Sequence, residues 1–117
     1  MTTRRLNLTS PALVDIADIL AHSAARFGQT AQNRYGALIG QAFIDLRNDP
    51  TRPTSSDRRE LAPGLRSYHL RHCRHRAPGV LRPRHIVIYD CPTPNELRVL
   101  RVLHDAMELQ RHLPADF

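Results

Sequence analysis

The residues best suited to chemistry lie close together near the middle of the chain: His69, His72, Cys73 and His75. Imidazole and thiolate groups at such short spacing could bind zinc. In the strand expected here, however, His69, Cys73 and His75 point to one face and His72 points to the other. The only other cysteine, Cys91, falls in a proline-rich turn. We therefore expect no metal and no cofactor at this cluster, and interpret it as part of a basic, partly exposed strand.

Motifs for nucleophilic or phosphate chemistry are absent from the sequence, which has no GxSxG, no glycine-rich phosphate loop and no HExxH. A metal-free ribonuclease remains an alternative, because RNA cleavage needs a base, an acid and cations for the phosphorane charge. His69, His85 and His104 with nearby arginines could supply these groups. The competing interpretation is that His85 and His104 are hydrogen-bonded members of a sheet.

Positive charge is concentrated in one segment. The chain has 117 residues, 17 basic and 11 acidic, and every basic residue is an arginine. Residues 58–84 hold eight arginines and one acid and so carry +7, whereas residues 1–57 carry +1 and residues 85–117 carry −2. Such a field favours an anionic partner, either nucleic acid or an acidic protein segment.

Length and composition place the chain among soluble single domains. Hydrophobic residues make up 41% and charged residues 24%, and no apolar run is long enough to span a membrane. The first residues lack the apolar stretch of a secretory signal, and two cysteines cannot form a disulfide framework. We therefore expect a cytoplasmic protein with no membrane partner.

Two helices are expected in the first half of the chain. Ser10 can cap a helix over residues 11–27, where apolar residues recur at helical spacing until Gly28. Thr30 can cap a second helix, which ends at the proline of the segment 48–50. The linker is so short that the two helices must form an antiparallel hairpin.

The remaining elements are expected to be strands and loops. Strand patterns occur at residues 4–8, 64–73, 84–90 and 96–104, a polar loop at 49–63, a long basic loop at 74–83 and a short helix at 105–113. The last strand is apolar on both faces, which is typical of a strand buried on both sides. The order β-α-α-β-β-β with a short C-terminal helix predicts an α+β fold. In it, an antiparallel helical hairpin packs on a twisted, mainly antiparallel three- to four-stranded sheet.

Several segments resemble the ParE branch of the RelE/ParE toxin superfamily. Residues 8–35 resemble its first strand and helical hairpin, and residues 61–70 and 85–89 resemble its middle strands. The most specific match is R-V-L-H-x-x-M-[DE], Arg101 through Glu108, within residues 97–113. Because the resemblance covers nearly the whole chain, we expect one toxin domain over residues 1–117.

The resemblance implies the toxin half of a bacterial type II toxin–antitoxin pair. ParE-type toxins inhibit DNA gyrase, which traps cleaved DNA, blocks replication and inhibits growth; such systems act in plasmid stability. A ParD-like antitoxin neutralises the toxin by wrapping a C-terminal segment over it. On this reading the chain is not an enzyme and has no catalytic residue. It meets nucleic acid only within a gyrase–DNA complex.

One departure from the ParE pattern and one comparison with the ribonuclease branch bear on this interpretation. Residues 71–83 are longer and more basic than the tight turn usual in ParE. The ribonuclease branch resembles the chain less, because Asp105 and Ala106 follow the last strand and an acid beside a scissile phosphate would repel it. The alternatives are therefore a RelE-like ribosome-dependent mRNA endonuclease, or an inactive relative that only binds its antitoxin.

Partner contacts, with the antitoxin or with gyrase, are expected from basic and aromatic residues of the second half. For Tyr89 and Met107, packing in the core is an equal alternative. Arg101 lies on an otherwise apolar strand and is expected to pair with a buried acid or with backbone carbonyls. The full set of expected contacts is Arg66, Arg82, Arg84, His85, Tyr89, Arg101, His104 and Met107.

Overall fold

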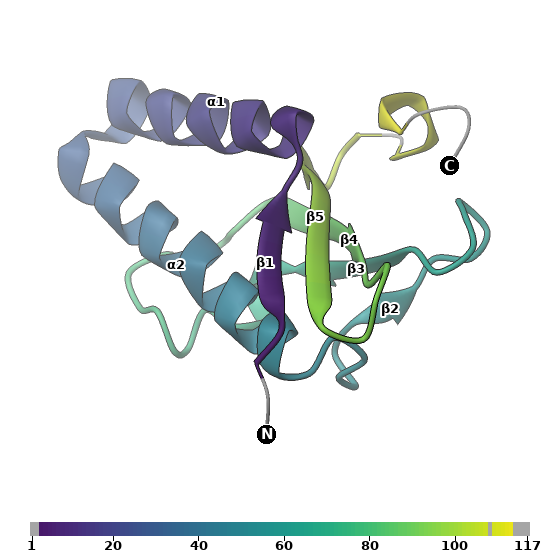
Figure 1. Ribbon diagram of the computed structural model, residues 1–117. Helices are drawn as coiled ribbons and strands as arrows, with labels where there is room; N and C mark the ends of the chain where they lie inside the picture. Colours follow the sequence, from purple (N-terminus) through teal and green to yellow (C-terminus); the bar gives the residue numbers. More distant parts are fainter. Residues whose placement is uncertain (1–2, 108, 114–117) are drawn as a thin grey trace.

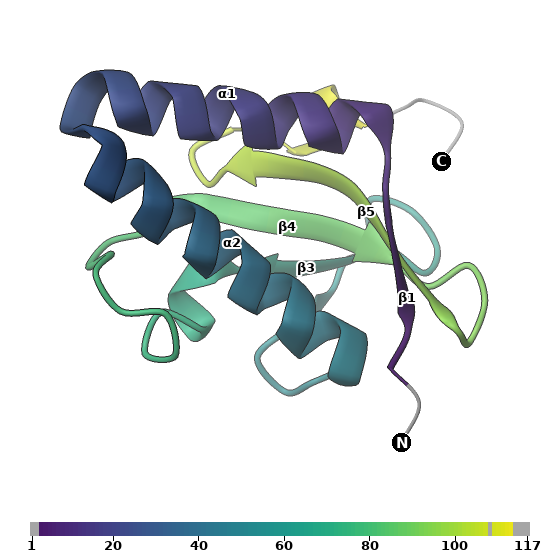
Figure 2. The ribbon, with the colours of Figure 1, turned by 60° about the vertical axis from the view of Figure 1, so that its left-hand side comes forward.

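In the computed structural model, which describes residues 3–107 and 109–113, two helices cover one face of a five-stranded sheet (Figures 1 and 2). The strand order is β1-β5-β4-β3-β2, with β1 parallel to β5 and the other pairs antiparallel. The elements are β1 (Arg5–Leu8), α1 (Ser10–Phe27), α2 (Gln29–Asn48), β2 (Ser56–Asp57), β3 (Arg66–His69), η1 (Leu70–His72), β4 (His85–Asp90), β5 (Glu96–His104) and η2 (Leu109–His112). The predicted α+β class and element order are confirmed.

The sheet has one strand more than the three or four expected. The additional strand, β2, consists of two residues inside the predicted loop 49–63, and it pairs with the start of β3. Two residues are too few to show an alternating pattern, so the sequence could not indicate this strand.

The helical hairpin has different caps from those predicted. The N-cap of α1 is Thr9 and not Ser10: its Oγ1 accepts a hydrogen bond from the Ala12 N–H at 3.2 Å and donates to the Leu100 carbonyl at 2.8 Å. Thr30 does not cap α2, because the single residue Gly28 separates the two helices. The φ of Gly28 is +94°, a conformation that favours glycine, and this allows the sharp reversal.

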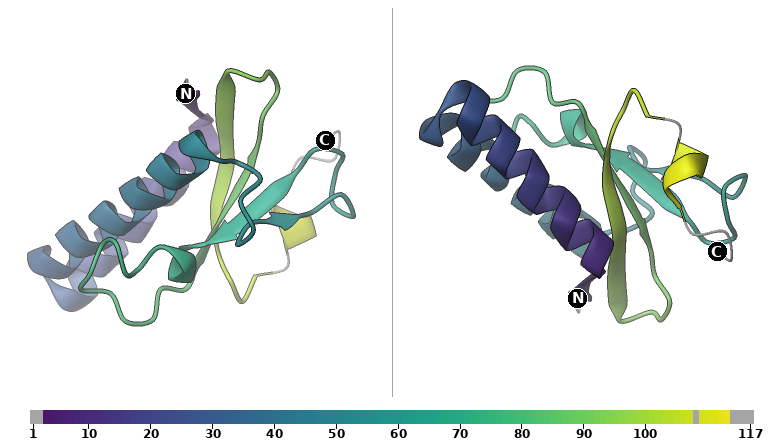
Figure 3. Two further views of the ribbon diagram at one scale, coloured as in Figure 1. Left: turned by 90° about the horizontal axis from the view of Figure 1, so that it is seen from below. Right: turned by 90° about the horizontal axis from the view of Figure 1, so that it is seen from above.

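Both faces of the sheet are covered by apolar side chains. The larger core lies between the sheet and the helices and includes Leu38, Leu46 and Val87. A smaller cluster lies on the other face, around Ile88 and Leu103. Figure 3 shows η2 on this second side, away from the helices. Strand β5 contributes to both clusters, so the prediction that it is buried on both faces is confirmed.

The predicted strand 64–73 is wrong in its second half. Strand β3 ends at His69, where the ring Nδ1 accepts a hydrogen bond from the Arg71 N–H at 3.1 Å and caps the short turn η1. This local bond competes with the strand ladder. Cys73 is consequently buried, with its Sγ 3.8 Å from the Leu38 carbonyl, while His75 is exposed. The facing assigned to His69, Cys73 and His75 from strand geometry therefore does not apply.

The long basic loop folds back onto α2, as Figure 2 shows. The Arg76 guanidinium bonds to the buried Asp45 carboxylate of α2. Val80 packs against the larger core. At Gly79, which has a φ of +112°, an added Cβ would lie 2.6 Å from Cδ of Arg34 on α2. The loop is thus fixed along its length.

The predicted C-terminal helix 105–113 is shorter than expected. The structure places a 3-10 turn, η2, at its end, and residue 108 lies outside the described residues. Among the described residues, no helix is long and apolar enough to cross a membrane.

Candidate partner-binding surfaces

A groove of about 850 Å³ opens where the helical hairpin meets the ends of β4 and β5. Its walls are the second half of α1 with the beginning of α2 on one side and loop residues 79–82 on the other, and we call it the hairpin–loop groove. The register of the sheet places His85 directly opposite His104. Five of the eight predicted contact residues line the groove: Arg82, Arg84, His85, His104 and Met107.

Exposed apolar side chains gather in this groove. Phe27, Leu81 and Met107 line it and are 68%, 80% and 44% exposed. They are half of the six large exposed apolar side chains among the residues that the structure describes. Apolar side chains that converge at the surface indicate an interaction site.

Cations outnumber acids around the same groove. Arg34, Arg82 and Arg84 line it, against the single carboxylate of Asp18. Arg84 pairs with Asp105 at 2.9 Å, whereas neither Arg34 nor Arg82 forms an ion pair with any described residue. The rim therefore carries positive charge that is free to meet an anionic partner.

A tyrosine and two histidines form the polar floor of the groove. The Tyr35 hydroxyl forms a hydrogen bond with His85 Nδ1 at 2.6 Å and accepts a hydrogen bond from the Arg84 N–H at 3.3 Å. The rings of His85 and His104 meet edge to face, with centroids 5.4 Å apart. Burial, followed by the neighbouring His104, lowers the pKa of His85 to about 4. His85 is consequently neutral at pH 7.

The depressed pKa of His85 predicts a pH-dependent stability. The pKa falls from 6.5 in an unperturbed histidine to about 4 in the fold, so between these values the unfolded chain binds the proton more readily. The free energy of unfolding should therefore drop as pH falls from about 6.5 to 4, by about 2–3 kcal/mol from this group. Urea unfolding across this range should show a shallower drop for His85→Gln. Parallel curves for the two proteins would contradict the assignment.

A second histidine is engaged on the other face of the sheet. His69 Nε2 bonds to Asp105 Oδ2 at 2.9 Å, and the same carboxylate accepts from Arg84. These bonds, with Arg84 first and His69 second, hold the pKa of Asp105 well below its usual range. Asp105 thus remains ionised and is bonded to both Arg84 and His69.

The three histidines that could serve acid–base chemistry all have Nδ1 in a hydrogen bond. His69 Nδ1 accepts from the Arg71 N–H, His104 Nδ1 accepts from the Ala106 N–H at 3.1 Å, and His85 Nδ1 bonds to the Tyr35 hydroxyl. None of the three Nδ1 atoms is therefore free to act as a base. The interpretation of His85 and His104 as hydrogen-bonded members of the sheet is confirmed.

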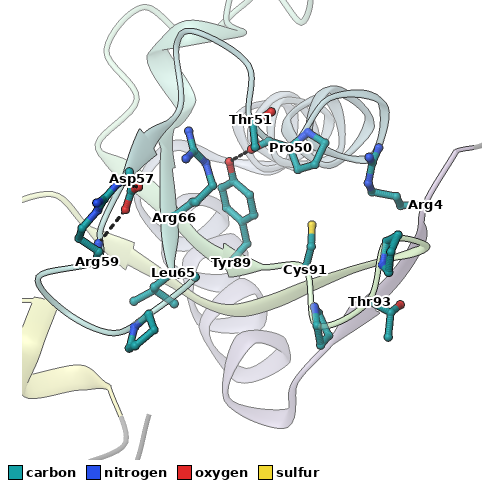
Figure 4. A pocket seen from close by; sticks show the side chains of 14 residues that line it. Arg4, Pro50, Thr51, Asp57, Arg59, Leu65, Arg66, Tyr89, Cys91 and Thr93 are labelled. Atoms are coloured by element: carbon teal, nitrogen blue, oxygen red, sulfur yellow. Dashed lines mark hydrogen bonds and ion pairs between the residues drawn. The ribbon is translucent and has the colours of Figure 1, made fainter.

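Arg66 and Tyr89 lie together in a different cleft, of about 750 Å³, at the opposite end of the sheet strands (Figure 4). Arg66 Nη2 donates to Ser55 Oγ at 2.6 Å. Tyr89 is fully buried and its hydroxyl donates to the Pro50 carbonyl, as the dashed line in Figure 4 marks. Its position matches the alternative of core packing, and it could touch a partner only after a rearrangement.

Arg101 belongs to neither surface. Its guanidinium donates to both carboxylate oxygens of Asp15, at 2.7 and 2.9 Å, and to the His112 carbonyl at 2.7 Å. The expectation that Arg101 pairs with an acid and a backbone carbonyl is confirmed. This pair joins β5 to α1.

The family model described as the ParE toxin of the type II toxin–antitoxin system parDE matches residues 6–109. The chain belongs to the ParE toxin family. A solved structure, described as the chromosomal ParDE TA system from P. aeruginosa, is similar in fold, with a TM-score of 0.63 and 17% sequence identity. The match covers 87% of this chain and 96% of that chain. No curated protein matches the chain.

The resemblance read from the sequence is thus confirmed, and the chain is a ParE-type toxin of a toxin–antitoxin system. Sequence reasoning missed part of this toxin's groove, namely Phe27, Arg34, Tyr35 and Leu81. Phe27 and Tyr35 fit the apolar stripes of the helices, and Leu81 is one apolar residue in a basic loop. The one feature of the sequence that pointed to this part of the groove is the basic segment 58–84, which contains Arg82 and Arg84 next to Leu81.

Proposed function

We propose that this ParE-type toxin binds DNA gyrase and blocks replication in the cytoplasm, and that a ParD-like antitoxin neutralises it. Membership of the ParE toxin family supports the proposal most strongly. The chemistry of the surface agrees with it, because inhibition by binding needs shape, apolar anchors and charge but no general base. The exposed apolar side chains of the hairpin–loop groove supply such features, as do Arg34 and Arg82, which form no ion pair with the residues that the structure describes.

The proposal predicts a direct effect on purified gyrase. Gyrase incubated with the toxin and relaxed plasmid should lose supercoiling activity and accumulate cleaved DNA as the toxin concentration rises. Toxin mixed beforehand with the product of the adjacent reading frame should have no effect. Gyrase that retains full activity at a large molar excess of folded toxin would refute the proposal.

A ribonuclease is the second candidate, and one observation favours it. His85 and His104 meet in a groove rimmed by arginines, which is where a base, an acid and phosphate-binding cations would be needed. Against it stand the occupied Nδ1 atoms and the ionised Asp105 beside Arg84. Incubation of the toxin with translating ribosomes tests this candidate. The ribonuclease would be supported if the wild-type toxin cuts transcripts and the His85→Gln or His104→Gln variant leaves them intact. A toxin that affects neither gyrase nor transcripts, and whose expression alone is harmless, is an inactive relative.

A further inference from the structure

We propose that the hairpin–loop groove holds an acidic, amphipathic segment of the antitoxin, and that loop residues 79–82 determine which antitoxin is accepted. The inference rests on the proposed function in one respect only, that an antitoxin partner exists. It adds the place of binding, the chemistry of the bound segment and the element that selects it.

The loop forms one wall of the groove and is held to the rest of the fold at several residues. It is fixed at Cys73, which is buried against α2, and at Arg76, which bonds to the buried Asp45. Val80 then packs into the larger core, while the next residue, Leu81, is 80% exposed. An apolar side chain held out from an anchored backbone loses little conformational freedom on binding, which makes it a good anchor for a partner.

The facing wall and the segment after β5 also contribute apolar side chains to the groove. Phe27 projects from the end of α1 at 68% exposure, and Met107 is 44% exposed after β5. Together with Leu81 they bound the groove from three separate parts of the chain. A partner segment with apolar residues along one side would cover all three, in the way an amphipathic segment fills a hydrophobic groove.

Charge indicates that this segment is acidic. Arg34 stands on the α2 side and Arg82 on the loop side, and neither has an ion-pair partner among the described residues. A nucleic acid backbone would also meet these arginines, but it would leave Phe27 and Leu81 without apolar contacts. A peptide that carries both acidic and apolar side chains satisfies both sets of residues.

The long loop supplies contacts that can distinguish one antitoxin from another. The segment 71–83 is where this chain departs from the usual ParE pattern, and it contributes Leu81 and Arg82 to the groove. An antitoxin fitted to a ParE with a tight turn would lack contacts for both residues. Discrimination then follows from apolar contacts and charge pairs that only the matching antitoxin makes.

The test measures the affinity of the purified full-length toxin for the product of the adjacent reading frame by titration calorimetry. Leu81→Asp and Arg82→Glu should each weaken binding, the first by about 30-fold or more, as for a central interface anchor. Ile44→Asp and Arg5→Glu are matched controls, because Ile44 is 52% exposed, Arg5 is exposed on β1, and both residues lie outside the groove. The controls should bind as the wild type does, and all four variants should unfold at the wild-type temperature.

The outcomes separate the two proposals. Wild-type toxin that binds the antitoxin, together with Leu81→Asp and Arg82→Glu variants that bind equally well, would overturn this inference and leave the proposed function intact. Equal weakening by Ile44→Asp would overturn it as well. Wild-type toxin that does not bind the antitoxin would refute the antitoxin part of the proposed function. If sedimentation shows that the toxin alone dimerises and that Leu81→Asp makes it monomeric, the groove serves a second copy and the inference fails.

Discussion

Replacing Asp45 by alanine is expected to lower the free energy of unfolding by about 3–5 kcal/mol, the cost of removing one partner from a buried ionic cluster. The side chain of Asp45 is 6% exposed. Its carboxylate accepts hydrogen bonds from the Tyr68 hydroxyl at 3.1 Å, from Gln41 Nε2 at 3.0 Å and from Arg76. Without it, a buried hydroxyl loses its acceptor and the Arg76 guanidinium loses its counter-charge.

Urea unfolding gives this loss as a shift of the midpoint at constant slope. Asp49→Ala is the matched control, because Asp49 is the exposed residue that ends the same helix and accepts only a 3.5 Å bond from Thr51. The control should change stability by less than about 1 kcal/mol. Asp45→Asn keeps an acceptor for Tyr68 but not the charge for Arg76, so it should fall between the two. Equal effects of Asp45→Ala and Asp49→Ala would show that the cluster contributes nothing.

The Asp45 cluster also shows what the sequence could not reveal. Residues that form it come from α2, from β3 and from the long loop, and their meeting depends on the path of a loop with no periodic pattern. The strand 96–104, in contrast, was predicted with its observed bounds, because dense apolar residues on both faces identify a central strand wherever the rest of the chain lies. A periodic helix or strand can be predicted from neighbouring residues alone. The ion pair between Asp45 and Arg76 cannot, because the two residues are 31 positions apart in the sequence.

Some residues of the candidate groove were predicted from the sequence and others were not. The sequence order favoured β4 and β5 as antiparallel neighbours joined by a short turn, which brings His85 and His104 near each other. A bulge between Ile88 and Tyr89 shifts the register by one residue and places the two histidines directly opposite each other, and the sequence pattern did not indicate this bulge. The exposure of Phe27 and Leu81 was not predicted, because whether an apolar side chain is buried depends on how distant parts of the chain pack around it. Arg66 was grouped with Arg84 by charge alone, and the fold places them at opposite ends of neighbouring strands.

The strongly basic segment is less basic in the fold than in the sequence. Of its eight arginines, four form ion pairs within the described residues, and their partners are the acids Glu60, Asp57, Asp45 and Asp105. Three of these acids lie outside the segment itself, so a count within the segment overstates its field. Arg82 remains without such a partner at the rim of the groove, which is why it is one of the two residues chosen to test partner selection.

Arg101→Ala is expected to destabilise the toxin by about 2–4 kcal/mol, the lower part of the range for breaking a buried pair because both partners keep some exposure. The side chains of Arg101 and Asp15 are 23% and 13% exposed. Besides the two bonds to Arg101, Asp15 accepts the Val102 N–H at 3.0 Å. The pair therefore joins the first half of α1 to β5, and its loss leaves a carboxylate that is mostly removed from water.

A double-mutant cycle separates this pair from its surroundings. Asp15→Ala and Arg101→Ala should each lower the free energy of unfolding, and the double variant should lose less than the two together, since neither charge is then left unpaired. Arg98→Ala is the control. Arg98 lies on β5, as Arg101 does, and makes a similar two-bond pair with Asp90 of β4, but its side chain is 35% exposed. Its removal should cost less than the removal of Arg101, because Arg98 is the more exposed of the two arginines. If the double variant shows the full sum of the single losses, Arg101 and Asp15 do not act as a pair, and the link between β5 and α1 must depend on their apolar contacts.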